Sequence, residues 1–247
     1  MIRPFLVAVQ FLTRLPVRLT AQISEKDIGY SLLYYPFVGL IIGLILAGFG
    51  WLMNGMPPLI AAALLVTIWI LLTGGLHLDG LADSADAWIG GLGDREKTLT
   101  IMKDPNCGPA GVSAIVLIIL LKFVSLHSFN TAGEWIAVVL AIILSRTVLP
   151  LLFLTTPYVR NNGLGSALAA FQPRNGSIFV IMLTVALIFL LTGNHYLWLV
   201  LAAAAIFLLL RQLMMRRIGG TTGDTAGALV EITEATVLLV AVIVFIK

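Results

Sequence analysis

Long apolar stretches alternate with short polar ones along most of the chain. Seven of them reach, or nearly reach, the roughly 20 residues that a helix needs to cross a bilayer. They lie at residues 33–53, 58–76, 112–129, 135–154, 178–191, 196–210 and 232–246. The fifth is short, and a turn around residues 194–195 separates it from the sixth. The pattern predicts an all-α, polytopic membrane protein with about seven transmembrane helices.

The apolar stretch at residues 5–15 differs from these seven. It is flanked by Arg3 and Arg14, and Pro16 ends it. At about a dozen residues it is too short to span a bilayer. We therefore expect an amino-terminal interfacial or re-entrant helix before the first span.

Outside the predicted spans, Lys and Arg occur in the amino-terminal arm and in alternate connections. The connections around residues 54–55, 130–134 and 193–195 contain neither residue type. The amino-terminal arm and the other connections contain Arg3, Arg14, Arg18, Lys26, Arg95, Lys97, Lys103, Arg160, Arg174, Arg211, Arg216 and Arg217. By the positive-inside rule, the amino terminus and the long loops are cytoplasmic. With seven spans, Lys247 would lie on the outer side.

Composition agrees with a single membrane domain over residues 1–247. Of the 247 residues, 60% are hydrophobic and only 11% are charged, which excludes an ordinary soluble domain. The one cysteine, Cys107, excludes an internal disulfide and a cysteine metal site. The net charge of +3 is small, and we expect no nucleic-acid partner. The sequence leaves a homo-oligomer open.

Three carboxylates follow the second apolar stretch. Asp79, Asp83 and Asp86 are spaced i, i+4 and i+7, so a helix would present them on one face. Like charges in this arrangement repel one another, and acids at a membrane boundary are costly without a partner. The divalent cation Mg²⁺ prefers carboxylate oxygens and keeps positions free for water or phosphate. The motif therefore predicts a magnesium site.

A second acidic motif lies at the predicted entrance to the last span. Gly219-Gly220-Thr221-Thr222-Gly223-Asp224 is followed by Glu231 and Glu234. A helix would align Asp224 with Glu231, and Glu231 with Glu234. The glycines, Gly223 among them, allow the close backbone approach that a phosphate cradle needs.

By the predicted topology, both acidic motifs open to the same leaflet. Together they could hold one or two Mg²⁺ ions that bridge a diphosphate, which is a route to phosphoryl or phosphodiester transfer. The alternative is a set of membrane-edge charges neutralised by Arg95, Lys97 or lipid headgroups. Three aligned aspartates and a second cluster favour the metal site.

Several other polar residues are candidates for binding or catalysis. Lys103 and Arg95, in the loop after the second span, are able to bind phosphate. Arg146 lies inside a span, where a charge is rare, and either reaches the acidic site or forms a buried ion pair with an acid of the last helix. Lys122 is expected to snorkel or to pair structurally. His77 either contacts substrate or is a satisfied histidine at the boundary.

Five motifs in the same order resemble the cobalamin synthase family, the adenosylcobinamide-GDP ribazoletransferases. The resemblance covers nearly the whole chain, and the five motifs together are highly specific. Ala87 is a departure, because many relatives have glycine after the last aspartate. The motifs are Phe11-Leu12-Thr13-Arg14-Leu15-Pro16, Tyr35-Pro36-Phe37-Val38-Gly39, Gly75-Leu76-His77-Leu78-Asp79-Gly80-Leu81-Ala82-Asp83, Ile101-Met102-Lys103-Asp104 and Gly219-Gly220-Thr221-Thr222-Gly223-Asp224.

The resemblance implies a Mg²⁺-dependent enzyme of the bacterial inner membrane, with its active site on the cytoplasmic side. Such an enzyme joins adenosylcobinamide-GDP to α-ribazole or its 5′-phosphate and releases GMP, late in cobalamin biosynthesis. We expect the ribose hydroxyl to attack the phosphorus attached to the cobinamide arm. The predicted metal ligands are Asp79, Asp83, Asp86 and Asp224. The predicted catalytic residues are Asp83 or Glu231 as the base, and Arg146. The predicted substrate-binding residues are His77, Lys103, Arg95 and Gly223.

Two other classes of membrane protein remain alternatives. A CDP-alcohol phosphotransferase or an aromatic prenyltransferase also has paired acidic motifs, but this chain has Asp83 where the first would have an arginine soon after Asp-Gly. A cation-coupled transporter would have acids near the midplane of the membrane. Here the acids cluster toward one face of the membrane, which favours an enzyme over a transporter.

Overall fold

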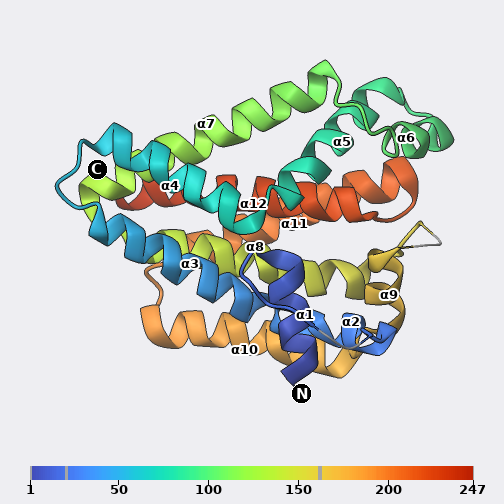
Figure 1. Cartoon of the computed structure of the whole chain (residues 1–247), viewed down its shortest axis with the longest axis horizontal. Coiled ribbons are helices and arrows are strands. Elements are labelled where there is room, and N and C mark those ends of the chain that lie inside the picture. Colours follow the sequence, from blue (N-terminus) through green and yellow to red (C-terminus); the bar gives the residue numbers. More distant parts are fainter. Residues whose placement is uncertain (1, 20–21, 161–162, 247) are drawn as a thin grey trace.

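The computed structural model describes residues 2–19, 22–160 and 163–246, and in this part the chain is all-helical apart from one backbone bridge, Tyr158 to Thr221. Figure 1 shows the arrangement of the helices. In order they are α1 (Ile2–Leu12), α2 (Glu25–Ser31), the 3₁₀ turn η1 (Leu32–Tyr34), α3 (Tyr35–Leu52), α4 (Pro58–Thr73), α5 (Leu76–Gly90), α6 (Arg95–Ile101), α7 (Pro109–Ala132), α8 (Trp135–Thr155), α9 (Leu164–Phe171), α10 (Arg174–Thr192), α11 (Leu197–Ile218) and α12 (Gly223–Phe245).

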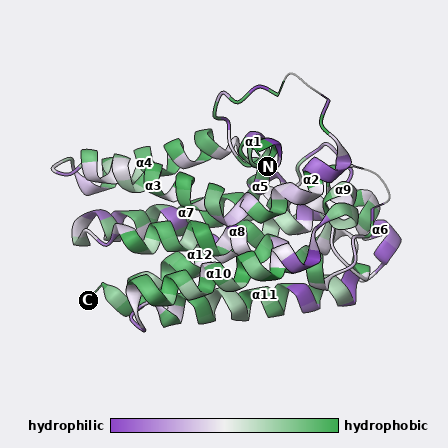
Figure 2. Cartoon of the chain, turned by 90° about the horizontal axis from the view of Figure 1, so that it is seen from below, coloured by the Kyte–Doolittle hydropathy of each residue, from purple (hydrophilic) through white to green (hydrophobic). Residues whose placement is uncertain are grey.

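The predicted fold class is confirmed. Among the described residues, six helical segments are long and apolar enough to cross a membrane, and the bent pair α4–α5 makes a seventh if it is one span. The α3–α4, α7–α8 and α10–α11 connections lie at one end of the bundle, and α6, α9 and the α11–α12 connection lie at the other (Figure 1). Hydrophilic positions gather at this second end (Figure 2). We call it the polar end.

The second predicted span, residues 58–76, ends earlier than expected. Gly74 and Gly75 both have positive φ (67° and 68°), a conformation that glycine adopts without strain. A bend of 90° follows, so the first acidic motif lies on a separate helix, α5. A Cβ at Gly74 would lie 2.0 Å from Nε of Arg14, because the arginine side chain covers the bend. The bend turns the carboxylates of α5 toward α12.

The last two helices are longer at the polar end than hydropathy predicts. Helix α11 continues to Ile218, and α12 begins at Gly223 instead of near residue 232. Thr222 starts α12 because its side chain accepts a hydrogen bond from Thr225 N, and Thr222 N in turn donates to the Thr225 hydroxyl (2.8 Å). The three acids of the second motif, Asp224, Glu231 and Glu234, therefore all lie on α12, and residues 219–222 form the connection that precedes it. Lys247, predicted to lie outside, is not among the described residues.

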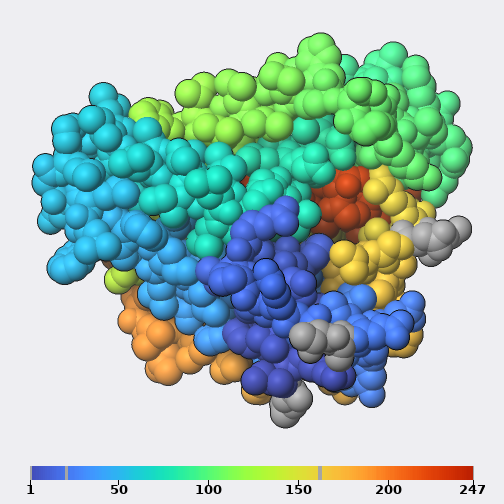
Figure 3. All heavy atoms as spheres, viewed as in Figure 1, coloured from blue at the N-terminus to red at the C-terminus, as the bar shows by residue number. Residues whose placement is uncertain are grey.

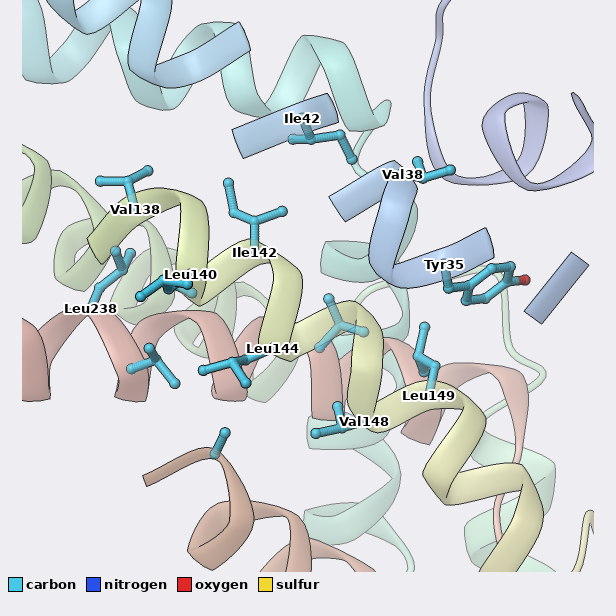
Figure 4. Packing of buried hydrophobic residues seen from close by; sticks show 14 of the residues in the cluster. Tyr35, Val38, Ile42, Val138, Leu140, Ile142, Leu144, Val148, Leu149 and Leu238 are labelled. Atoms are coloured by element: carbon cyan, nitrogen blue, oxygen red, sulfur yellow. The ribbon is translucent and has the colours of Figure 1, made fainter. Parts of the chain in front are cut away.

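Helix α8 forms the centre of the bundle, between α3 and α12. Apolar side chains from these three helices interdigitate, as Figure 4 shows for Val38, Ile142 and Leu238. A Cβ at Gly39 would lie 2.9 Å from the carbonyl oxygen of Ile142, so only glycine permits this approach of α3 to α8. Close packing through small residues is the main source of helix association in a bilayer.

Three short helices cover the polar end beside α3. Helix α1 confirms the expected short amino-terminal helix and packs against α2, which packs against α9. The α2–α9 contact is tight, because a Cβ at Gly29 would lie 2.3 Å from the backbone carbon of Phe171. The three helices therefore form one wall of the polar end.

Candidate active site

Glycines bring the two acidic motifs together. Helices α5 and α12 touch at Gly80, where a Cβ would lie 2.7 Å from the carbonyl oxygen of Asp224. One turn further in, a Cβ at Gly227 would lie 3.3 Å from Cα of His77. The glycine of the Asp-Gly pair in the first motif thus has a structural role, because it allows α12 to pack closely against α5. Asp79 and Asp224 consequently line the same cavity.

A third segment joins this contact from the end of α8. Val159 N donates to Thr221 O (3.0 Å), and Thr221 N donates to Pro157 O (2.8 Å). The approach requires Gly220, since a Cβ there would lie 2.2 Å from the Pro157 oxygen. The bridge holds the segment that ends at Arg160 against the start of α12. Nη2 of Arg160 then lies 2.6 Å from Oδ2 of Asp224.

The cavity has a volume of about 270 Å³, and Asp79 of α5, Asp224 of α12 and Arg160 all reach it. His77, Gly223 and Tyr158 also line it. In Figure 3 the red atoms of the α11–α12 region lie recessed between the teal α4–α5 region, the yellow segment before α9 and the blue amino-terminal part. We call it the acid cavity. Burial raises the pKa of the Tyr158 hydroxyl above its usual range, so this group stays protonated at neutral pH.

The remaining two aspartates of α5 have different surroundings. Asp83 is half-buried and lies within electrostatic reach of Asp224 and Asp79. Asp86 accepts hydrogen bonds from the backbone N–H groups of Gly108 (2.7 Å) and Gly111 (2.9 Å). A carboxylate at this position neutralises the positive end of α7 and fixes the loop before it. The structure thus gives Asp86, predicted as a metal ligand, two protein partners of its own.

The carboxylates suit magnesium in kind, but they do not form a closed cage. In the parts of the chain that the structure describes, no group of three or more His, Cys, Asp or Glu side chains is arranged to hold a metal. Asp224 faces Arg160, and Asp86 faces the start of α7. Asp79 and Asp83 remain, and Mg²⁺ commonly binds through one or two carboxylates together with substrate phosphates and water. The donor set fits an ion that arrives with a phosphorylated substrate.

A basic groove adjoins the acid cavity. It has a volume of about 640 Å³, and Arg95, Lys103 and Arg160 line it together with Glu96. Arg95 is held in place because its Nε donates to Ile218 O (2.9 Å). Arg160 lines both spaces, so an anion bound to it would touch the acid cavity on one side and the groove on the other. The predicted phosphate-binding residues Arg95 and Lys103 thus lie beside the predicted acids.

Two predicted catalytic residues lie outside the cavity, in a buried ion network. Lys122 Nζ lies 2.7 Å from Glu231 Oε2, and both Lys122 and Arg146 pair with Glu234. All four side chains are at least nine-tenths buried. Lys122 also lies over the ring of Trp69, 4.3 Å from its centre. The network holds α7, α8 and α12 together. Arg146 thus forms the buried ion pair with an acid of the last helix that was one of its two predicted roles.

His77 links the network to the cavity. Its side chain is buried, lines the cavity and lies within electrostatic reach of Arg146 and Glu234. Nδ1 has no hydrogen-bond partner among the described residues. A neutral histidine in this position has a nitrogen free for a bound molecule. The geometry therefore allows the predicted contact of His77 with substrate.

The chain is similar to known proteins over almost its whole length. The model of the cobalamin-5-phosphate synthase family matches residues 4–242. The chain belongs to this family. A protein from Pseudomonas fluorescens named adenosylcobinamide-GDP ribazoletransferase is 53% identical over 96% of this chain and 97% of its own length. Proteins of the same name from Pseudomonas syringae and Pseudomonas paraeruginosa are 50% and 51% identical over the same shares. No solved structure matches the chain.

Membership of the cobalamin-5-phosphate synthase family confirms the resemblance seen in the five motifs. The sequence marks Arg160 only as one of the charges that set the orientation, and it does not single out Tyr158. No local motif marks either as part of a site, because the backbone bridge to Thr221 brings them there. The one usable signal in the sequence is that the positive-inside rule predicts this arginine on the same side of the membrane as the two acidic motifs.

Proposed function

We propose that this chain joins adenosylcobinamide-GDP to α-ribazole or α-ribazole 5′-phosphate and releases GMP. The product is adenosylcobalamin or its 5′-phosphate. Family membership supports the reaction, and the observation that carries its location is the meeting of Asp79, Asp224 and Arg160 in one cavity. The reaction makes one phosphodiester and breaks one diphosphate, so it needs acids, a cation and phosphate-binding side chains at one place.

The step balances without a further reactant. The ribose hydroxyl oxygen of the acceptor bonds to the phosphorus that carries the cobinamide arm. The bond from that phosphorus to the bridging oxygen breaks, and GMP leaves with the electron pair. The hydroxyl proton goes to a carboxylate. We assign this base role to Asp83, because it lies within electrostatic reach of Asp79 and Asp224, whereas the alternative, Glu231, is paired with Lys122 in the buried ion network.

Charge neutralisation is the main task of the site in such a transfer. Arg160 contacts the diphosphate from between the acid cavity and the basic groove, and Lys103 and Arg95 contact it from the groove. Asp79 and Asp83, with Asp224 close by, would hold Mg²⁺, which would supply positive charge to the phosphate oxygens. Arg146 and Glu231 act through the ion network, by holding α8 and α12 in register beneath the cavity.

The site lies at the polar end of a multi-pass membrane protein. We propose that this end faces the cytoplasm, because the Lys- and Arg-containing connections gather there, and that the membrane is the bacterial inner membrane. A nucleotide-linked donor and a nucleoside acceptor would then reach the cavity from the aqueous side.

The test is a turnover assay with the full chain in lipid vesicles. The substrates are adenosylcobinamide-GDP and α-ribazole 5′-phosphate, and both GMP and the corrinoid product are followed. We expect equal amounts of the two products, loss of both with EDTA, and recovery with Mg²⁺. No product from a folded protein would contradict the function. Turnover that EDTA does not change would contradict the metal assignment alone.

A further inference from the structure

A second, largely apolar pocket lies beside the acid cavity, between α1, α2 and α9. Its volume is about 220 Å³. Its walls include Val7, Phe11, Ile28, Tyr35, Leu164 and Leu168. We call it the α1–α2–α9 pocket. The tight contact between Gly29 of α2 and Phe171 of α9 holds two of its walls together.

The pocket and the acid cavity share part of their lining. Phe11, Tyr35, Leu164 and Leu168 line both spaces. The two spaces therefore adjoin at these four side chains, which belong to the same lining as Asp79 and Asp224. The catalytic acids thus have two neighbours of opposite character, the apolar pocket and the basic groove.

The shared wall is aromatic and contains one buried polar group, the Tyr35 hydroxyl. The rings of Phe11 and Tyr35 lie nearly parallel, with centres 6.5 Å apart. Tyr35 is 1% exposed, and beyond the Ser31 hydroxyl beside it, its hydroxyl has no hydrogen-bond partner among the described residues. Figure 4 shows the Tyr35 ring pointing away from Val38 and Ile42, with the hydroxyl outermost. The nearby Ser31 hydroxyl donates to Ile28 O (2.6 Å). A buried hydroxyl of this kind is costly unless a bound molecule satisfies it.

We propose that the α1–α2–α9 pocket binds the apolar aromatic base of the acceptor nucleoside. This inference rests on the proposed function, in which the acceptor is a ribonucleoside of a benzimidazole. A flat, uncharged heterocycle matches aromatic walls, and its sugar or ring nitrogen is able to pair with the Tyr35 hydroxyl. The ribose then extends into the acid cavity, toward the diphosphate.

The other parts of the two substrates fit this pocket poorly. The guanosine diphosphate of the donor is polar and anionic, and it matches the basic groove lined by Arg95, Lys103 and Arg160. The corrin ring is far larger than a pocket of about 220 Å³. An acyl chain of a lipid would fill the apolar space but would offer no further hydrogen-bond partner to the Tyr35 hydroxyl. The acceptor base both fits the shape of the α1–α2–α9 pocket and is able to form a hydrogen bond with the Tyr35 hydroxyl.

The assignment gives the transfer a direction. The acceptor approaches the phosphorus from the α1–α2–α9 pocket, and GMP leaves into the basic groove, which shares no lining residue with that pocket. Attack and departure on opposite sides of the phosphorus are what an in-line displacement requires.

Thiol protection tests the proposal without turnover. Because Cys107 is the one cysteine, Cys107→Ala gives a thiol-free background for Ile28→Cys in the α1–α2–α9 pocket and, as the control, Ile136→Cys in α8 at the opposite end. Maleimide labelling is followed in lipid vesicles with α-ribazole, with GMP and with neither. We expect α-ribazole to slow labelling at position 28 by about tenfold, as a site at least nine-tenths occupied would. GMP should have no effect, and position 136 should respond to neither.

The outcomes separate this proposal from the function. Protection by GMP, or no effect of α-ribazole in a preparation of the parent chain that turns over, would overturn the pocket assignment alone. Labelling already blocked by lipid and unchanged by α-ribazole would assign the pocket to an acyl chain, which also overturns it. Protection by α-ribazole with no turnover by the parent chain would retain the pocket and contradict the function.

A kinetic pair covers the case in which the introduced thiol does not react. Val7→Phe fills the α1–α2–α9 pocket, and Ile2→Phe makes the same kind of change on the exposed face of α1. We expect Val7→Phe to raise KM for α-ribazole at least about tenfold, equivalent to 1.4 kcal/mol, and to leave KM for the donor within twofold of the parent. Ile2→Phe should change neither. An unchanged acceptor KM in Val7→Phe would overturn the proposal.

Discussion

Nη2 of Arg160 lies 2.6 Å from Oδ2 of Asp224, and neither residue is near the other in the sequence. Arg160 comes from the segment after α8, whereas Asp224 lies in the first turn of α12. The backbone bridge between Tyr158 and Thr221 fixes their separation. The same arginine lines the basic groove, so it connects the predicted acids with the predicted phosphate-binding residues.

Removing the charge of Arg160 should abolish most of the transfer. Arg160→Gln deletes the cation between the acid cavity and the basic groove, and loss of one such electrostatic contact typically lowers kcat by about 10²–10³-fold. The assay is GMP release in lipid vesicles at saturating substrates. Arg174→Gln, at the exposed start of α10, is the matched control and should stay within twofold of the parent. Near-normal turnover of Arg160→Gln would remove Arg160 from the mechanism.

Asp83 offers a test of the metal and of the base together. Asp83→Asn keeps the size of the side chain but removes its charge, so turnover should fall by at least about 10²-fold. The Mg²⁺ concentration for half-maximal turnover should also rise, because one carboxylate ligand is lost. Asp104→Asn, an exposed turn residue that bonds Asn106 N (3.0 Å), is the control and should behave as the parent chain. An unchanged Mg²⁺ requirement in Asp83→Asn would contradict its role as a ligand.

The buried ion network should act on stability. Glu234→Gln leaves Lys122 and Arg146 without their shared partner, and breaking a buried pair costs about 3–5 kcal/mol. We expect a clearly lower unfolding midpoint in detergent, measured by loss of helical circular dichroism. Glu25→Gln, in the exposed first turn of α2, should shift the midpoint little.

Glu231 separates structure from catalysis in the same network. Glu231→Gln should also lower the unfolding midpoint, because Glu231 is the second acid bound to Lys122. The fraction that stays folded at low temperature should keep turnover within about tenfold of the parent, since the residue does not line the acid cavity. A folded variant with no turnover would restore Glu231 as the base.

A glycine pair tests whether the backbone bridge positions Arg160. Gly220→Ala introduces a Cβ that would lie 2.2 Å from Pro157 O, so the segment before Arg160 must move. We expect turnover to fall by at least about tenfold, with membrane insertion retained, since small displacements in an active site have large kinetic effects. Gly48→Ala, where a Cβ meets nothing within 4 Å, should leave turnover unchanged. Equal turnover of the two variants would show that the bridge is dispensable.

Much of the fold follows from hydropathy, because each span must be apolar over a fixed length. The break between α4 and α5 was missed because Gly74 and Gly75 are themselves apolar by composition and change only the backbone direction. The early start of α12 was missed for a related reason. Thr222 and Asp224 lower the hydropathy, yet the reciprocal bonds of Thr222 and Thr225 make this segment helical.

The sequence predicts those residues of the candidate site whose role follows from the spacing of charges alone. Asp79, Asp83 and Asp224 are recognisable because acids at a span boundary need a cation. The surroundings of Asp86 and Glu231 could not be predicted from the sequence. Whether an acid faces a cavity, a helix start or a buried lysine depends on contacts with distant segments. Arg160 depends on such a contact entirely.

A double-mutant cycle on Arg160 and Asp224 tests whether these two residues act together in one active site. Values of kcat/KM are measured for the parent, Arg160→Gln, Asp224→Asn and the double variant, all in lipid vesicles with Mg²⁺. If the two residues serve one site, each single change lowers kcat/KM strongly and the double variant is little worse than the poorer single one, because residues that act as a unit are not additive. Fully multiplicative losses, or a single variant with normal turnover, would contradict the account.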